Sequence, residues 1–235
     1  MAETDLVIVD ALTVRRGRFT LEIPRWAVAP GQVVGVVGPN GAGKTTLLES
    51  LAGLRPSDGG AVRVFGLDPW RKPVEVRSAL GFMSDDLPVF PMRVGRLLRF
   101  VSGYYPTWDP ELVERLLERF QLDPHDKTQQ LSRGQGTRLR LVLAMAFKPR
   151  VLVLDEPAGG LDLAGRRALL DTVLEIAGDP ERSVVISSHQ LSDIERIADR
   201  LLVLNRGRVT HEGPTAELIG EGRTIEEALL EWGAA

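Results

Sequence analysis

Hydrophobic and polar positions alternate with different periods in different parts of the chain. The stretch FTLEIPRWAV places Phe19, Leu21 and Ile23 on one side of an expected strand, with more polar residues between them. The run QVVGVV (32–37) is mostly apolar, as expected for a strand that is buried on both faces. Residues 1–37 are therefore expected to consist mainly of strands.

Helical spacing dominates the middle of the chain, from about residue 93 to residue 147. Asp109 followed by Pro110 predicts a helix start, because aspartate caps free N–H groups and proline suits the first helical position. In the following ELVERLLERF, Leu112, Leu116 and Phe120 share one helical face. We therefore expect a helical subdomain at approximately residues 86–147.

After residue 150, short apolar runs alternate with helical patterns: VLVLD, LAGRRALLDTVLEIA, SVVISS and QLSDIERIA follow one another. Such alternation predicts a parallel sheet with crossover helices. Further strands are expected at 61–65, 80–83, 201–204 and 207–211, and a last helix near 224–232. Together these elements predict a single α/β domain spanning residues 1–235.

Composition agrees with one domain and excludes several kinds of site. Of the 235 residues, 43% are hydrophobic, which is enough for a core. The net charge of -3 gives no basic excess, so we expect no direct contact with nucleic acid. There is no cysteine, which excludes disulfides, thiol catalysis and cysteine-ligated zinc. His125, His189 and His211 are too far apart in the sequence to suggest a metal cluster.

Targeting and membrane signals are not found either. The first ten residues, MAETDLVIVD, are acidic and lack a long apolar stretch, so we expect no signal peptide. No window reaches the ~18 apolar residues that a membrane helix needs. A cytoplasmic protein is expected, which meets a membrane only through a partner.

The segment GPNGAGKT (38–45) matches the phosphate-binding pattern G-x-x-x-x-G-K-[ST]. Its glycines allow a tight turn whose N–H groups point at phosphate oxygens, and the helix that follows adds its positive end. Lys44 is expected to reach the β- and γ-phosphates, and the Thr45 hydroxyl to bind Mg²⁺. Since the loop follows a buried strand and precedes a helix, a chance glycine turn is the weaker interpretation. The expected nucleotide-binding residues of this loop are Gly38, Pro39, Asn40, Gly41, Ala42, Gly43, Lys44, Thr45 and Thr46.

Two acidic residues, Asp155 and Glu156, end the apolar strand VLVLD. Ligands bind at the carboxyl ends of strands in open α/β sheets. Asp155 can hold Mg²⁺ through water, and Glu156 can polarise the water that attacks a γ-phosphate. Alone, the pair would also fit a strand that simply ends in an acidic turn. Together with the glycine loop, it favours a catalytic role.

A second turn, LSRGQ (131–135), also has features of a phosphate site. Ser132 could cap a helix, and Gly134 leaves a backbone N–H accessible. Without its context, an ordinary serine-capped helix would be the better interpretation.

The motifs GPNGAGKTT, LSRGQ, VLVLDEP, GGLD and SSHQLSDIERIADR follow one another with the order and spacing of ATP-binding-cassette (ABC) ATPases. The resemblance covers nearly the whole chain, which looks like the nucleotide-binding subunit of an ABC transporter. The stretch YYPTWDPELVERLLERFQLDP most resembles subunits that serve ABC-2-type exporters. The family implies a P-loop NTPase fold with a mostly parallel core sheet flanked by helices, an N-terminal antiparallel β subdomain and a helical subdomain.

The resemblance also implies partners, cofactors and roles. ATP with Mg²⁺ would be hydrolysed by a head-to-tail homodimer, or a dimer with a related ATPase subunit, that drives a separate membrane permease at the inner face of the cell membrane. In this family, each signature turn closes over the ATP of the other chain, so Ser132, Gly134 and Gln135 would face that chain's γ-phosphate. Asp162 of GGLD would lie at the dimer seam, and His189 would be the switch histidine that contacts the γ-phosphate.

One departure from the family lies after the strand at 80–83, where the family usually has glutamine and this chain has Asp85. An acid there can bind Mg²⁺ and take part in catalysis, but it also repels the γ-phosphate. At ~4 Å and an effective dielectric constant of ~20, either interaction is about 4 kcal/mol, so the position of Asp85 decides the sign. Asp86 is expected to be a solvated neighbour.

Two further departures are arginines. Arg16 stands where an aromatic residue usually stacks on adenine, and its planar guanidinium can also stack on a base. Phe19 is a possible substitute, although its alternation suggests the core. Arg133 replaces a common glycine of the signature turn and faces either solvent or phosphate.

Two rival functions are compatible with a glycine loop. A non-transport ABC ATPase that acts on ribosomes or nucleic acid usually carries tandem cassettes or a coiled-coil insert, and neither is found in this sequence. A monomeric P-loop kinase or GTPase would need neither LSRGQ nor His189.

Overall fold

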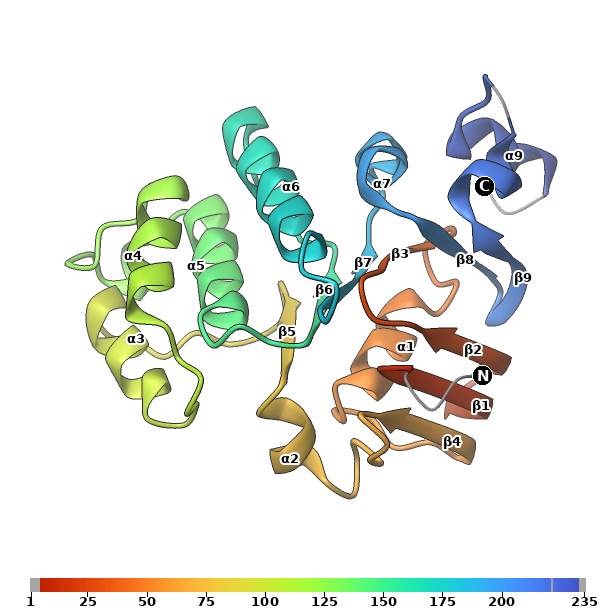
Figure 1. Ribbon diagram of the computed structural model, residues 1–235, viewed down its shortest axis with the longest axis horizontal. Coiled ribbons are helices and arrows are strands. Elements are labelled where there is room, and N and C mark those ends of the chain that lie inside the picture. Colours follow the sequence, from red (N-terminus) through yellow and green to blue (C-terminus); the bar gives the residue numbers. More distant parts are fainter. Residues whose placement is uncertain (1–4, 221, 233–235) are drawn as a thin grey trace.

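The computed structural model describes residues 5–220 and 222–232 (Figure 1). The first four residues, part of the signal-peptide argument, and the last three of the expected domain lie outside this description. The described strands form one nine-stranded sheet in the order β4-β1-β2-β9-β8-β3-β7-β6-β5. Their bounds are β1 Val7–Arg16, β2 Phe19–Val28, β3 Val33–Val37, β4 Gly59–Val64, β5 Leu80–Ser84, β6 Val151–Asp155, β7 Ser183–Ser187, β8 Arg200–Asn205 and β9 Arg208–Pro214.

The centre of the sheet is parallel, with β8, β3, β7, β6 and β5 side by side. Every residue of β3, β6 and β7 is buried. Along β3, Val33 and Val37 pack into one hydrophobic cluster, and Val34 and Val36 into another. Because both faces are covered, these strands are almost entirely apolar rather than alternating, as predicted.

Helices cover the two faces unequally. One cluster contains α1 (Lys44–Leu51) together with the antiparallel strands. The other contains α6 (Leu163–Ala177), α7 (Leu191–Ile197) and α9 (Ile225–Glu231), as well as helices of the middle segment. The crossover helices predicted after residue 150 are therefore present.

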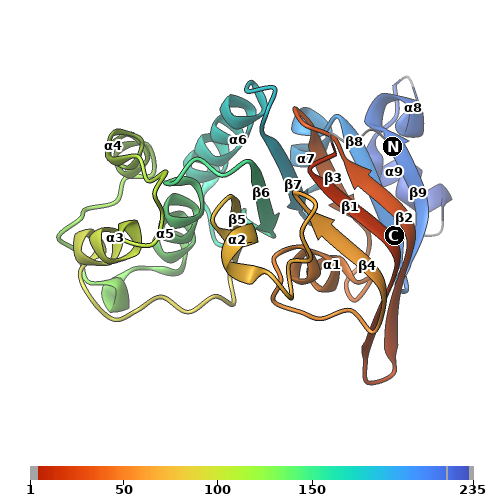
Figure 2. The same cartoon turned by 60° about the horizontal axis from the view of Figure 1, so that its bottom comes forward.

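The antiparallel strands β4, β1 and β2 continue the same sheet (Figure 2). A single parallel pair, Glu22 with Arg208, joins β2 to β9, and β9 runs antiparallel to β8. The predicted combination of a mostly parallel core with antiparallel N-terminal strands is confirmed.

The middle segment lies to one side of the sheet, at the left of Figure 1. It contains α3 (Val94–Ser102), α4 (Pro110–Arg119), a 3₁₀ turn (Thr128–Gln130) and α5 (Arg133–Met145). Asp109 caps α4 as predicted, because its carboxylate accepts a hydrogen bond from the Leu112 N–H at 2.9 Å. No helix of the described residues is long and apolar enough to cross a bilayer.

Two short helices were not predicted, α2 (Pro73–Arg77) and α8 (Thr215–Ile219). Each has five residues, which is too short for a 3.6-residue period to show in the sequence.

Candidate nucleotide-binding and catalytic site

A cavity of about 480 Å³ lies where the loops after β3 and β6 meet. It brings together residues that are up to 173 positions apart in the sequence. Its lining residues are Arg16, Phe19, Asn40, Gly41, Ala42, Gly43, Lys44, Thr45, Thr46, Asp86, Glu156 and His189.

The glycine loop has a backbone that side chains would not tolerate. Gly38 and Gly43 have φ values of 143° and 111°. A Cβ on Gly38 would lie 2.0 Å from the Leu204 carbonyl oxygen, and one on Gly43 would lie 2.8 Å from Leu21 Cδ1. Gly43 is also the N-cap of α1 and offers no side-chain cap, so the first N–H groups of this helix are available to an anion.

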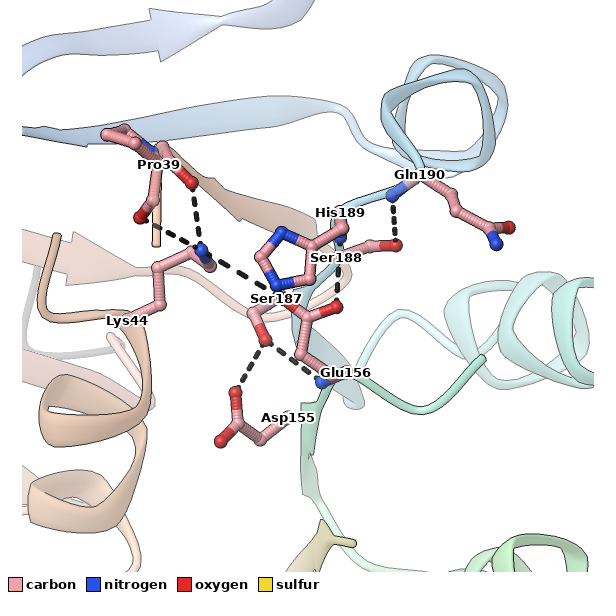
Figure 3. A network of polar contacts seen from close by, with 9 residues as sticks. Pro39, Lys44, Asp155, Glu156, Ser187, Ser188, His189 and Gln190 are labelled. Atoms are coloured by element: carbon pink, nitrogen blue, oxygen red, sulfur yellow. Dashed lines mark hydrogen bonds and ion pairs between the residues drawn. The ribbon is translucent and has the colours of Figure 1, made fainter. Parts of the chain in front are cut away.

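Lys44 brings a buried cation to the cavity (Figure 3). Its ammonium donates to the carbonyl oxygens of Gly38 at 2.8 Å and Pro39 at 3.3 Å, and lies 3.9 Å from Glu156 Oε1. Burial lowers the pKa of Lys44, while the charges of Glu156 and Asp155 act in the opposite direction. Because neutral carbonyls do not neutralise the ammonium, its positive charge remains available to a phosphate.

Asp155 and Glu156 are linked by a residue that the sequence did not single out, Ser187 at the end of β7. The Ser187 hydroxyl donates to Asp155 Oδ1 at 2.7 Å and accepts from the Glu156 N–H at 3.0 Å (Figure 3). Asp155 and Ser187 are partners in the parallel register. The polar end of SVVISS was the available signal, but only the strand order places it beside Asp155.

The Glu156 backbone has a strained conformation, and one of its carboxylate oxygens accepts no hydrogen bond from the described residues. Its φ of 50° is in the left-handed region, which is unfavourable for a residue with a side chain. Oε2 accepts from the His189 N–H at 2.9 Å. Oε1 is buried and accepts no hydrogen bond in the described residues, although it lies 3.1 Å from His189 Nε2. This orphaned acceptor fits a ligand group, such as a water molecule, in the cavity.

Burial also raises the pKa of Glu156. This effect outweighs the hydrogen bond from His189 and the charges of His189 and Lys44, which lower the pKa. A carboxylate that is less stabilised in its charged form is a stronger base, which suits a residue that polarises water.

The residues also fit a nucleotide-bound Mg²⁺. Within the described residues, no group of three or more histidine, cysteine, aspartate or glutamate side chains could hold a metal by itself. Thr45 lines the cavity, whereas Asp155 is buried directly before Glu156 and does not line it. The Thr45 hydroxyl and, through water, the Asp155 carboxylate would provide oxygen ligands of the kind that Mg²⁺ prefers, and phosphate oxygens would supply others.

Asp85 is not among the lining residues of the cavity, whereas Asp86 is. Asp85 Oδ1 accepts from the Thr137 hydroxyl at 3.0 Å, and Oδ2 lies 3.1 Å from Arg133 Nη2. Asp85 is thus held by Thr137 and Arg133 outside the cavity lining, which does not favour its expected Mg²⁺-binding and catalytic roles. Asp86 is exposed, as expected, and it also lines the cavity. Both follow directly after β5, and which of two adjacent acids turns toward the cavity depends on a local backbone that the sequence does not reveal.

Both candidates for adenine stacking, Arg16 and Phe19, line the cavity. Phe19 packs at the edge of the core, where a Cβ on Gly43 would lie 3.1 Å from its ring, while Leu21 and Ile23 are fully buried. The choice between the two stacking residues stays a prediction.

The signature turn and Asp162 lie outside the cavity lining. Ser132 caps α5 in a capping box, in which its hydroxyl accepts from the Gln135 N–H at 3.2 Å and its own N–H donates to Gln135 Oε1 at 2.9 Å. Asp162 caps α6 and pairs with Arg138 Nη2 at 2.5 Å. Gly134 lies so close to the loop after β6 that a Cβ on it would be 2.6 Å from the Gly160 carbonyl oxygen. Their roles toward a second chain's phosphate stay predictions.

Comparison with known proteins supplies independent information. The profile of the ABC transporter family matches residues 21–159. A daunorubicin resistance ATP-binding protein of Streptomyces coeruleorubidus is 36% identical over 99% of this chain and 76% of its own length. An energy-coupling factor transporter ATP-binding protein of Symbiobacterium thermophilum is 35% identical over 85% of this chain and 73% of its own length. An uncharacterized ABC transporter ATP-binding protein of Bacillus subtilis is 30% identical over 87% of this chain, which spans 66% of that relative.

Solved structures agree with this assignment. The structure of an ATP-binding subunit of an ABC transporter superposes with a TM-score of 0.88 at 25% identity, covering 97% of this chain and 99% of the other. The fold is also shared by an ATP-bound bacterial Atm1-family exporter, with a TM-score of 0.82 at 22% identity over 100% of this chain and 43% of that one.

Proposed function

The chain belongs to the ABC transporter family, whose ATP-binding domains hydrolyse ATP, and from this premise we propose that it is the ATPase subunit that drives a separate membrane permease. The observation that carries the proposal is the cavity that joins the glycine loop to Glu156 and His189. There, a buried ammonium lies 3.9 Å from a buried carboxylate oxygen that accepts no hydrogen bond from the described residues.

Each residue around the cavity takes one part of the hydrolysis. The loop from Gly38 to Thr46 and the start of α1 bind the phosphates through backbone N–H groups, and Lys44 adds charge. Thr45 and Asp155 hold Mg²⁺, which neutralises charge on the phosphates when bound. Glu156 orients and polarises the attacking water, and His189, whose N–H fixes the Glu156 carboxylate, contacts the γ-phosphate.

A head-to-tail dimer completes the site. In one chain, Ser132, Gly134 and Gln135 do not line the cavity that would hold its ATP. A second copy, or a related ATPase subunit, would bring its own signature turn to that cavity, and Asp162 would lie near the seam. Residues 86–147 would then form a helical subdomain that carries this turn.

A permease-facing surface is supported at the junction of the β5 loop with the helices of the middle segment. A groove of about 250 Å³ lies there, and Leu54, Phe82, Val101, Tyr105, Leu143 and Phe147 are among its lining residues. Close to it, Phe90, Phe100 and Tyr104 are more than 45% exposed and make edge-to-face contacts at centroid distances of 6.2 and 5.5 Å. Exposed aromatic clusters of this kind mark interaction sites.

We further propose that the permease is an exporter and that the chain acts at the inner face of the membrane. The support is the similarity of the α4 region to ABC-2-type subunits and the relative from Streptomyces coeruleorubidus, which is named for drug resistance. Co-purification of the chain with an integral membrane protein tests this assignment.

Dimerisation is tested with Ser132→Arg in a Glu156→Gln background, by size-exclusion chromatography with ATP and Mg²⁺. Arginine at Ser132 should prevent the ATP-dependent dimer while ATP binding to the monomer is kept. Thr224→Arg is the matched control, because Thr224 caps α9 through the same kind of capping box with Glu227. If both variants dimerise equally well, the signature turn is not part of the interface.

A further inference from the structure

Two residues that depart from the family pattern are in contact in the structure. Asp85 stands where the family usually has glutamine, and Arg133 where it commonly has glycine. The Arg133 Nη2 atom lies 3.1 Å from Asp85 Oδ2 and forms an ion pair with it. The two residues are 48 positions apart in the sequence, so the pair links the loop after β5 to the signature turn.

The two partners are held very differently. Asp85 Oδ1 accepts from the hydroxyl of Thr137, a fully buried residue, and the Asp85 side chain is 27% exposed. The Arg133 side chain is 77% exposed, and its aliphatic part packs on Gly160, where a Cβ would lie 3.2 Å from Arg133 Cγ. The carboxylate is therefore fixed, while the guanidinium end can exchange its partner.

The start of α5 has the chemistry of an anion site. This helix has 13 residues and no acid in its first turn. The capping box uses the Gln135 N–H, and among the described residues no acceptor is found for the N–H groups of Arg133 and Gly134. Two free N–H groups, the positive end of a helix and a guanidinium together attract a negative group, and Asp85 supplies one from the same chain.

We propose that Arg133 exchanges Asp85 for the γ-phosphate of ATP bound by a second chain, so that the Asp85–Arg133 pair is a latch that opens when the ATP-loaded partner docks. The inference rests on the proposed head-to-tail dimer. An exposed ion pair changes an equilibrium by roughly fivefold or less. A doubly charged phosphate in a closed interface binds a guanidinium more strongly, since the bond is charge-assisted and less screened. The exchange therefore favours the dimer, and Asp85 opposes it at low ATP concentration.

The test measures the ATP concentration at half-maximal dimer formation, by size-exclusion chromatography with light scattering, in the Glu156→Gln background. Asp85→Asn removes the competing charge and should lower this midpoint by about two- to fivefold. Arg133→Gly removes the phosphate ligand and should raise it by about tenfold or more, with Arg133→Lys in between. ATP affinity of the monomer should not change, because neither residue lines the cavity.

The decisive variant is the double substitution. If the two residues act as a latch, Asp85→Asn should not change the ATP midpoint in a chain that also carries Arg133→Gly. Simple repulsion by Asp85 would instead lower the midpoint equally with Arg133 present and with Arg133→Gly. Three results would contradict the latch but leave the proposed dimer intact. They are an equal lowering of the midpoint by Asp85→Asn in both backgrounds, a midpoint raised by Asp85→Asn, and a midpoint unchanged by Arg133→Gly. A Glu156→Gln parent that stays monomeric with ATP overturns the proposed dimer, and the latch with it. Thermal unfolding without nucleotide verifies that each variant is folded.

Discussion

The glycine-loop region and the signature-turn region of this chain are both suited to phosphate, but they differ in what they leave unsatisfied. Around the glycine loop, a buried ammonium and an orphaned carboxylate oxygen, on Lys44 and Glu156, face one cavity. At the signature turn, Ser132 and Gln135 satisfy each other through the capping box. The second region satisfies these capping groups within the chain, and none of its residues lines the cavity of its own chain.

This difference indicates that the glycine-loop region and the signature-turn region have separate roles. We expect the glycine-loop region to bind a nucleotide within one chain, because its predicted phosphate ligands belong to residues 38–46 and residues 40–46 line the cavity. The signature turn presents free N–H groups at a helix start and needs a second molecule to use them. Variants in the first region should therefore change nucleotide binding or hydrolysis directly, whereas variants in the second should spare nucleotide binding by the single chain and weaken dimerisation.

The largest effect is expected from Lys44→Ala. The substitution removes the buried charge next to the phosphates, so ATP turnover should fall by more than about 10³-fold and tight ATP binding should be lost. The ATPase rate and nucleotide binding by calorimetry measure both effects. Lys72→Ala is the control, because Lys72 is exposed, pairs with Glu75 and does not line the cavity. Turnover near the wild-type rate in a folded Lys44→Ala chain would remove the glycine loop from the mechanism.

Glu156→Gln separates binding from chemistry within the same region. The amide keeps the size of the side chain but loses its basicity, so hydrolysis should fall by about 10²-fold or more while ATP binding survives. An ATP-bound dimer should then accumulate and be visible by size-exclusion chromatography. Wild-type turnover by this variant would shift the catalytic role to another acid, and Asp86 would be the next candidate because it lines the cavity.

Gly134→Ala tests the second region. Its Cβ would clash with the Gly160 carbonyl oxygen at 2.6 Å, so the start of α5 or the loop after β6 must move. We expect a loss of about 1–3 kcal/mol in unfolding free energy and weaker ATP-dependent dimerisation. Gly136→Ala is the matched control, since its Cβ would meet only the flexible end of Arg140 at 3.4 Å. Equal stability of the two variants would show that the close packing at Gly134 is not needed.

The smallest effect is a pH-dependent change in stability. Burial raises the pKa of Glu156 above its ordinary value of 4.5, so the folded state binds a proton more tightly than the unfolded state. Glu156 therefore destabilises the wild type as the pH rises through the raised pKa, and Glu156→Gln should be more stable than the wild type at neutral pH. The difference should vanish below about pH 4.5, where the carboxyl is protonated in both states. Thermal unfolding without nucleotide at several pH values measures it, and a difference of constant size at all pH values would contradict the assignment.

Much of the fold could be predicted from the sequence because its patterns are local. Apolar runs gave β3, β6 and β7, the Asp109–Pro110 pair gave the start of α4, and α6 covers the predicted helical run. The short helices α2 and α8 were missed, since five residues carry no clear period.

The candidate site was predicted less evenly. Residues of the glycine loop and Glu156 and His189 come together at the cavity as their motifs indicate. Ser187 was missed, because its contact with Asp155 depends on the strand order. Asp85 and Asp86 are adjacent, and only the backbone after β5 decides which one faces the cavity. The contact between Asp85 and Arg133 could not be predicted from two separate departures in distant motifs.

The most direct test of the division between the two regions mixes two inactive chains. In a head-to-tail dimer of a Lys44→Ala chain with a Ser132→Arg chain, one site combines both defects, while the other combines an intact glycine loop with an intact signature turn. An equal mixture should therefore recover ATPase activity, and each mixed dimer should reach at most about half of the wild-type rate, because one of its two sites is intact. A chain carrying both substitutions should rescue neither single variant. No recovery in mixtures whose heterodimers are demonstrated by differently tagged chains would contradict the account, because it would mean that the signature turn serves the nucleotide of its own chain.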